Sequence, residues 1–110
     1  MPGRLLILEP GTTRRIDLRA RLAATFPHPV LAATPAEARS LARAQAPDLV
    51  VIGTGVPVPE LERLAAALRA LPGAPPALVA LRPCTDGPGR RAALAAGLDD
   101  VLPDLPDGAL

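Results

Sequence analysis

Lysine is absent from this chain of 110 residues, so all 12 of its cationic side chains are arginines. Set against 11 acidic residues, they leave a formal net charge of +1. A chain this close to neutrality lacks the excess of positive charge that nucleic acids and anionic membrane surfaces attract. We therefore expect neither nucleic acid nor membrane as a partner.

Aromatic residues and cysteine are almost as scarce. Phe26 is the single aromatic residue, so the core must be built from Leu, Val, Ile and Ala. Cys84 has no second cysteine with which to form an internal disulfide, which favours a reducing cytoplasm. We find no signal-peptide pattern, and the longest apolar runs are too short to cross a bilayer. We therefore expect a cytoplasmic protein.

Short apolar runs alternate along the chain with segments of helical periodicity. The runs predict strands at residues 5–8, 30–33, 49–52, 77–81 and 101–102, and the periodic segments predict helices at about 12–26, 34–46, 61–71 and 88–96. Strict alternation with short loops predicts a parallel sheet covered by helices on both faces. We therefore predict a single domain over residues 1–110 with a flavodoxin-like three-layer α/β fold and strand order 2-1-3-4-5.

Local signals mark several helix ends. Thr34-Pro35-Ala36-Glu37 predicts a capping box with proline at the first helical position. Thr12 or Thr13 is suited to cap the first helix, and Gly97 to end the fourth. A fifth helix is expected and nearly absent, because Asp107-Gly108-Ala109-Leu110 provides only its first turn. We expect the chain to be the amino-terminal part of a longer protein.

Three segments, in the right order and at the right distances, carry a resemblance to a known family. They are Arg4-Leu5-Leu6-Ile7-Leu8-Glu9, then Pro47-Asp48-Leu49-Val50-Val51-Ile52 with Pro57 after it, and Gly97-Leu98-Asp99-Asp100-Val101-Leu102-Pro103-Asp104. Together they resemble the CheY-like receiver domains of bacterial response regulators, over essentially the whole chain. The resemblance implies a role in two-component signal transduction.

The same resemblance implies that the phosphorylation chemistry is lost. In that family an acidic pair and a phosphoacceptor aspartate bind magnesium, and a hydroxyl and a lysine hold the phosphoryl oxygens. By position, Glu9 keeps one carboxylate, whereas Pro10, Gly53, Leu81 and Asp104 replace the second acid, the phosphoacceptor, the hydroxyl residue and the lysine. Magnesium requires several oxygen ligands in near-octahedral geometry. We therefore expect no catalytic residue, no metal and no cofactor.

Other polar residues have simpler structural explanations. Thr54 has no nearby base to activate its hydroxyl and is better explained as a turn residue. Asp48 precedes its strand, at the wrong end for this chemistry, while Asp99 and Asp100 are expected to shape the turn before the last strand. Cys84 is a lone thiol in a loop.

Two glycine-rich stretches and two arginine clusters are weaker signals. Gly53-Thr54-Gly55 and Gly87-Pro88-Gly89 match neither common phosphate-binding pattern. The arginines of residues 14–21 and 90–91 have no interleaved aromatic residues, so solvated helix faces explain them.

Our interpretation is a non-enzymatic pseudo-receiver that acts through protein–protein contact. Its expected partners are an output domain, another signalling protein or a second copy. A homodimer would use residues 90–110 or the side of the first helix, next to apolar sheet left uncovered near Leu6, Leu8 and Val101. The alternatives are a regulatory domain that senses a nucleotide-like ligand at the degenerate crevice, the amino-terminal domain of a diguanylate cyclase response regulator, and an enzyme.

Overall fold

A five-stranded parallel sheet forms the centre of the molecule, in a computed structural model that describes residues 3–82 and 87–103. The strands are β1 (Leu5–Leu8), β2 (Val30–Ala32), β3 (Leu49–Ile52), β4 (Ala77–Arg82) and β5 (Asp100–Pro103). The helices are α1 (Thr12–Leu22), α2 (Pro35–Gln45), α3 (Val58–Arg69) and α4 (Gly87–Ala95).

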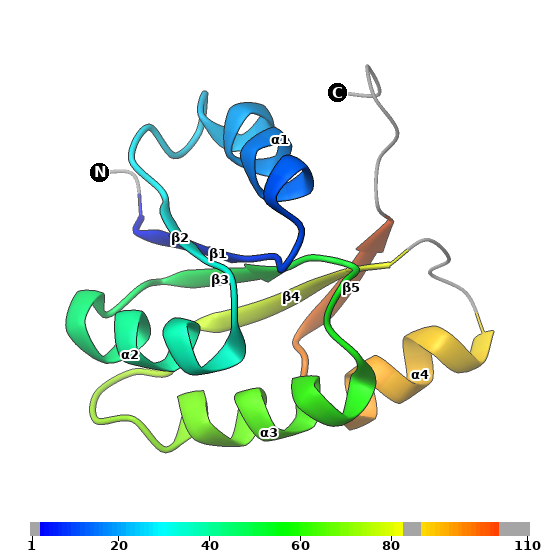
Figure 1. Cartoon of the computed structure of the whole chain (residues 1–110). Helices are drawn as coiled ribbons and strands as arrows, with labels where there is room; N and C mark the ends of the chain where they lie inside the picture. Colours follow the sequence, from blue (N-terminus) through cyan, green and yellow to red (C-terminus); the bar gives the residue numbers. More distant parts are fainter. Residues whose placement is uncertain (1–2, 83–86, 104–110) are drawn as a thin grey trace.

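The strand order is β2-β1-β3-β4-β5, which confirms the predicted topology. Figure 1 shows α1 alone on one face of the sheet and α2, α3 and α4 on the other. This three-layer arrangement is what the alternation of strand and helix predicted. The nearly absent fifth helix falls on residues 104–110, outside the described residues.

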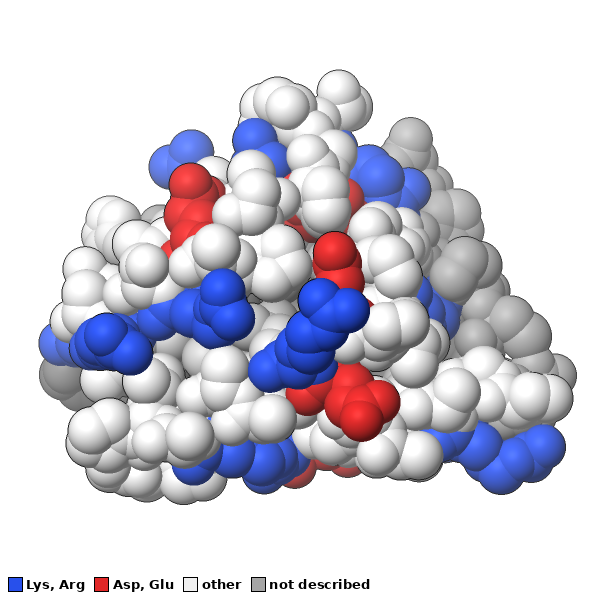
Figure 2. All heavy atoms as spheres, turned by 60° about the horizontal axis from the view of Figure 1, so that its bottom comes forward, with Lys and Arg blue, Asp and Glu red and all other residues white. Residues whose placement is uncertain are grey.

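The face under α2, α3 and α4 holds the larger hydrophobic core. Leu6 and Leu8 of β1, Val50 and Ile52 of β3, and Leu64 of α3 belong to this cluster, each at most 1% exposed. Successive side chains of a strand point to opposite faces, so these alternate residues of β1 and β3 lie together. On the outer side of these helices, arginine and acidic side chains lie interspersed (Figure 2).

The face under α1 holds a smaller cluster, in which Leu5, Ile7 and Val51 are buried. The cluster is extended by partly buried residues, among them Leu18 of α1. No residue of α1 itself, all of which is described, is fully buried. Ile16 is consequently 60% exposed, and α1 rests on the sheet through one side only.

The expected uncovered patch near Leu6, Leu8 and Val101 is wrong. Leu6 and Leu8 belong to the core of the three-helix face, and Val101 is 1% exposed. The prediction assigned Leu6 and Leu8 to the wrong face of the sheet. Side chains alternate between the two faces along a strand, and the neighbouring residues of β1 are the ones that face α1. Among the described residues, the exposed large apolar side chains are instead Ile16, Leu94 and Leu102, the last of them 45% exposed.

The first helix also differs from the prediction. It ends at Leu22 instead of near Phe26, and its N-cap is Gly11, which provides no side-chain cap. Pro27 disfavours a helical conformation at the residue before it, and the helix ends in tighter turn bonds, from the Ala23 N–H to the Ala20 carbonyl at 3.4 Å and from the Thr25 N–H to the Leu22 carbonyl at 3.1 Å. Within the described ranges, no helix is long and apolar enough to cross a membrane.

Candidate functional site

The carboxyl ends of β1, β3 and β4 meet at one edge of the sheet, because the strands are parallel. Glu9 follows β1, Gly53 follows β3, and Arg82 is the last residue of β4. Flavodoxin-like folds bind their ligands at this edge. We refer to the space between these three residues as the crevice.

Glu9 is the only buried charged residue of the described chain, with 1% of its side chain exposed. Its Oε2 accepts a hydrogen bond from the Gly11 N–H at 2.7 Å. Its Oε1 lies 3.6 Å from Arg14 Nε, yet accepts no hydrogen bond from any residue in the described ranges. Arg15 Nη1 donates to the Glu9 carbonyl at 2.8 Å and fixes the backbone there. One ion pair and one backbone N–H thus stabilise a carboxylate that is otherwise removed from water.

Gly53 lies directly beneath this carboxylate. A Cβ added to Gly53 would lie 2.8 Å from the Glu9 Cδ and closer still to Oε1. Gly55 is also crowded, because its Cβ would lie 3.0 Å from Glu9 Oε2 and 3.2 Å from the Pro10 Cδ. The glycines of the β3–α3 loop therefore allow the backbone to approach the first acidic residue closely. Packing explains them without a phosphate ligand.

Arg82 reaches the same loop from β4. Its Nη2 donates to the Val56 carbonyl at 2.8 Å, and its Nη1 lies 3.5 Å from the Thr54 carbonyl. Partial burial lowers the pKa of the Arg82 guanidinium, because desolvation disfavours the charged form. The guanidinium therefore bridges β4 to the β3–α3 loop.

Sequence reasoning missed Arg82 and gave the crevice position on β4 to Leu81. The Leu81 side chain packs instead against the cluster of Leu5 and Ile7 under α1. Alternation along β4 directs the next residue, Arg82, away from that face. Both faces of β4 carry apolar residues, Leu78 and Ala80 on one and Val79 and Leu81 on the other, so the sequence held no signal for this assignment.

Among the described residues, the remaining candidates do not lie together in the structure. Pro10 follows Glu9 and packs against Gly55. Asp48 lies at the opposite sheet end, where its Oδ2 accepts the Arg4 N–H at 2.8 Å. Asp104 and Cys84 lie outside the described residues.

The paired acids before β5 have structural contacts. Asp99 Oδ2 accepts the Leu78 N–H at 2.7 Å, and Asp100 Oδ1 accepts the Val101 N–H at 2.8 Å. These bonds hold the turn that leads into β5, as predicted.

The residues present do not fit the magnesium ion of receiver chemistry. In the described ranges, no three His, Cys, Asp or Glu side chains form a group able to hold a metal. The one buried carboxylate of the crevice is packed between glycine backbone and the Arg14 guanidinium. A hard cation requires several oxygen ligands. The arrangement is an internal electrostatic contact, and we derive no phosphoryl transfer from it.

No protein-family model and no curated protein sequence matches the chain. Solved structures do match its fold. The receiver domain of the sensor histidine kinase PA1611 from Pseudomonas aeruginosa is 22% identical, with a TM-score of 0.77, over 94% of this chain and 86% of that one. The chemotaxis protein CheY4 from Vibrio cholerae is 14% identical, with a TM-score of 0.75, over 97% and 90%.

A third structure, the N-terminal domain of an uncharacterized protein from Wolinella succinogenes, is 24% identical with a TM-score of 0.67, over 92% of this chain and 81% of that one. Identities this low, with nearly complete coverage, establish a likeness of fold. The chain therefore has the flavodoxin-like fold of response-regulator receiver domains.

Proposed function

We propose that this chain is a phosphorylation-independent pseudo-receiver of two-component-derived signal transduction, which acts through protein–protein contact and not as an enzyme. One observation carries the proposal. The Glu9 carboxylate lies against Gly53, in the space where a phosphoacceptor side chain would begin. This contact supports the proposal, because the Glu9 side chain occupies the space into which a side chain at position 53 would extend.

The environment of Glu9 adds weight to this proposal. An aspartate at position 53 would bring a second carboxylate against one that is 1% exposed. Two like charges in such a site oppose each other's ionisation, and the Cβ contact forces Glu9 to move. The charge of Arg82 is already engaged by loop carbonyls. Together these features support a crevice whose side chains keep one arrangement and do not switch between two states.

A domain of this kind would transmit its signal by binding other proteins. A yeast receiver domain, that of the response regulator Ssk1 from Saccharomyces cerevisiae, was crystallised with the histidine phosphotransfer protein Ypd1. For this chain we propose a second copy or an output domain as partner, and a cytoplasmic location. The exposed apolar side chains Ile16 of α1 and Leu102 of β5 offer contact area on the α1 face of the sheet.

Phosphoryl loading tests the proposal directly. The protein is incubated with magnesium and acetyl phosphate, and its intact mass is measured beside that of an active receiver domain treated in the same way. We expect the active domain to gain one phosphoryl group and this chain to gain none. A stoichiometric gain by this chain would contradict the proposal. Beryllofluoride is likewise expected not to bind.

The variant Gly53→Asp separates a missing aspartate from a filled crevice. If only the aspartate were missing, this variant would bind magnesium tightly in calorimetry and accept phosphate from acetyl phosphate. We expect neither, together with a loss of about 2 kcal/mol in the free energy of unfolding from crowding against Glu9. The comparison variant Gly73→Asp, at a glycine with φ of 89° and no atom near its added Cβ, carries backbone strain without that contact, so a larger loss in Gly53→Asp would come from crowding.

A further inference from the structure

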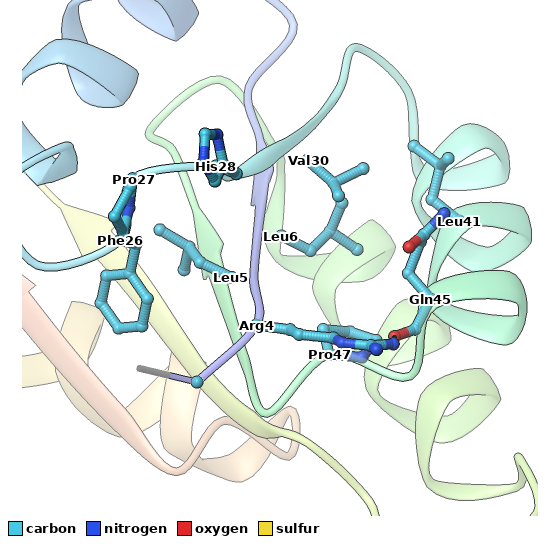
Figure 3. A pocket seen from close by; sticks show the side chains of 11 residues that line it. Arg4, Leu5, Leu6, Phe26, Pro27, His28, Val30, Leu41, Gln45 and Pro47 are labelled. Carbon is cyan, nitrogen blue, oxygen red and sulfur yellow. Dashed lines mark hydrogen bonds between the residues drawn. The ribbon is translucent and has the colours of Figure 1, made fainter. Parts of the chain in front are cut away.

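A cavity of about 330 Å³ lies at the opposite end of the sheet from the crevice, around the start of β1 (Figure 3). It exists because the edge strand β2 begins late. The first β2 residue, Val30, pairs with Leu6, so the preceding part of β1 has no β2 partner. Pro27 and Pro29 lack the N–H groups that would extend the ladder.

The walls of the cavity are mainly apolar and come from both faces of the sheet. Leu5 and Phe26 lie on one side of β1, and Leu6, Val30 and Leu41 lie on the other (Figure 3). The volume is at the lower end of the range in which proteins bind small molecules. A compact apolar group therefore has room and contacts here.

Polar groups lie at the rim. Arg4 extends along Pro47 toward α2, where its Nη1 donates to the Gln45 carbonyl at 2.7 Å (Figure 3). A guanidinium has five N–H donors in a planar fork, and this bond uses one of them. His28 adds an exposed imidazole above β1. Asp48 is bound to the Arg4 N–H and is not part of the lining, so the charge within the walls is positive.

The composition of these walls is unusual for this chain. Its single phenylalanine and its single histidine both lie here. Phe26 also packs against the Leu5 cluster, and this contact explains why part of its ring is buried. His28 lies exposed between two prolines and contributes nothing to the core. Core packing thus explains Phe26 in part and does not explain His28.

We propose that this cavity binds a small organic carboxylate with a compact aromatic or branched apolar body. The apolar body would pack against the partly exposed side chains of Phe26, Val30 and Leu41, and the carboxylate would bind the Arg4 guanidinium with His28 beside it. Arginine is suited to this role because its fork matches the two oxygens of a carboxylate. The site is separate from the crevice and requires no phosphorylation chemistry.

Three probes with the same apolar body and different head groups test the chemistry. 3-Phenylpropionate, 3-phenylpropan-1-ol and 3-phenylpropan-1-amine are titrated separately into the protein, and backbone amide shifts are followed by NMR. We expect saturable shifts at residues 4–6, 28–31 and 41–45, with the carboxylate bound about tenfold more tightly than the alcohol and the amine weakest. Equal affinity for all three, or shifts located elsewhere, would overturn the proposal.

Two variants and a control locate the interaction. Arg4→Gln is expected to weaken carboxylate binding about tenfold and to leave alcohol binding unchanged, because only the charged contact is removed. Arg43→Gln, on the exposed surface of α2 outside the cavity, is the matched control and should change neither. Leu41→Trp should fill the cavity and abolish binding of all three probes. Unchanged carboxylate binding in a folded Arg4→Gln protein would show that Arg4 is not the site.

Discussion

The sheet face under α2, α3 and α4 buries alternate residues of β1, β3 and β4 fully, together with residues of the helices, whereas the face under α1 buries Leu5, Ile7 and Val51 with partly exposed neighbours. Helices lie side by side on the first face, and the second carries one helix with no fully buried residue (Figure 1). Burial of apolar area is the main stabilising contribution to folding. The first face therefore contributes more to the stability of the domain, and the second keeps more of its apolar side chains partly exposed.

The largest test of this comparison removes one leucine from each face. Leu64 of α3 is 1% exposed, so Leu64→Ala leaves a cavity and should lower the free energy of unfolding by about 3 kcal/mol. Leu18 of α1 is only partly buried, and Leu18→Ala should cost about 1 kcal/mol. Urea unfolding measures both. Equal losses would show that the two faces are packed alike.

A smaller change probes how closely the three-helix face is packed. Gly97 ends α4 with φ of 112°, and a Cβ there would lie 3.0 Å from the Ala65 Cβ of α3. Gly97→Ala should cost about 2 kcal/mol, from backbone strain and from the contact with α3. Gly73, with φ of 89° and no atom within 4 Å of its added Cβ, is the matched control.

For Gly73→Ala we expect about 1 kcal/mol, because only the backbone strain remains. Thermal unfolding of the two variants, compared with the unchanged protein, gives the difference. If both variants lose the same stability, α3 and α4 tolerate an extra methyl group and the packing argument for that face fails.

Self-association tests whether the α1 face is a contact surface. We expect a homodimer in which Ile16→Asp or Leu102→Asp weakens pairing about tenfold, equivalent to about 1.4 kcal/mol. Leu94 on α4 is 36% exposed and belongs to the other side, so Leu94→Asp is the control and should not change pairing. Sedimentation at several micromolar concentrations, with and without acetyl phosphate, provides the measurement.

Two results would contradict this expectation. A monomer at every concentration would show that no dimer forms. Weaker pairing in Leu94→Asp alone would show that the dimer contact lies on α4. Pairing that responds to acetyl phosphate would instead contradict phosphorylation independence.

The order of elements was predictable from sequence because it depends on local pattern. Short apolar runs such as Leu49–Ile52 indicated buried strands, and Gly97 has the left-handed conformation that its position after α4 predicted. Thr34 caps α2 as predicted, with its Oγ1 accepting the Glu37 N–H at 3.1 Å. Each of these signals is contained within a few neighbouring residues.

The contacts of the crevice were not predictable in the same way. The sequence shows that position 53 lacks an aspartate, but not that Glu9 lies in its place, because that contact joins two strands through the tertiary fold. The exchange of Leu81 for Arg82 at the crevice depends on which face of β4 each side chain occupies. A shift of one residue reverses the face, and no local pattern fixed it.

The smallest expected effect on stability concerns the amino-terminal ends of α2 and α1, which lie on opposite faces of the sheet. In α2, the Thr34 side chain caps the helix, and the Glu37 Oε1 accepts the N–H of Ala33 at 2.7 Å, one residue before the position that a capping box would use. In α1 the N-cap is Gly11, and no side chain caps the helix among the described residues. Thr34→Ala should therefore lower the free energy of unfolding by about 1 kcal/mol.

Thr12→Ala and Thr13→Ala are the matched controls on α1 and should change stability by less than about 0.5 kcal/mol, because neither hydroxyl replaces the missing cap. Urea unfolding of the three variants measures the difference. If Thr12→Ala costs as much as Thr34→Ala, the α1 terminus is held in solution by a bond that the structure does not contain. The single helix of the second face would then be more firmly anchored than its packing indicates.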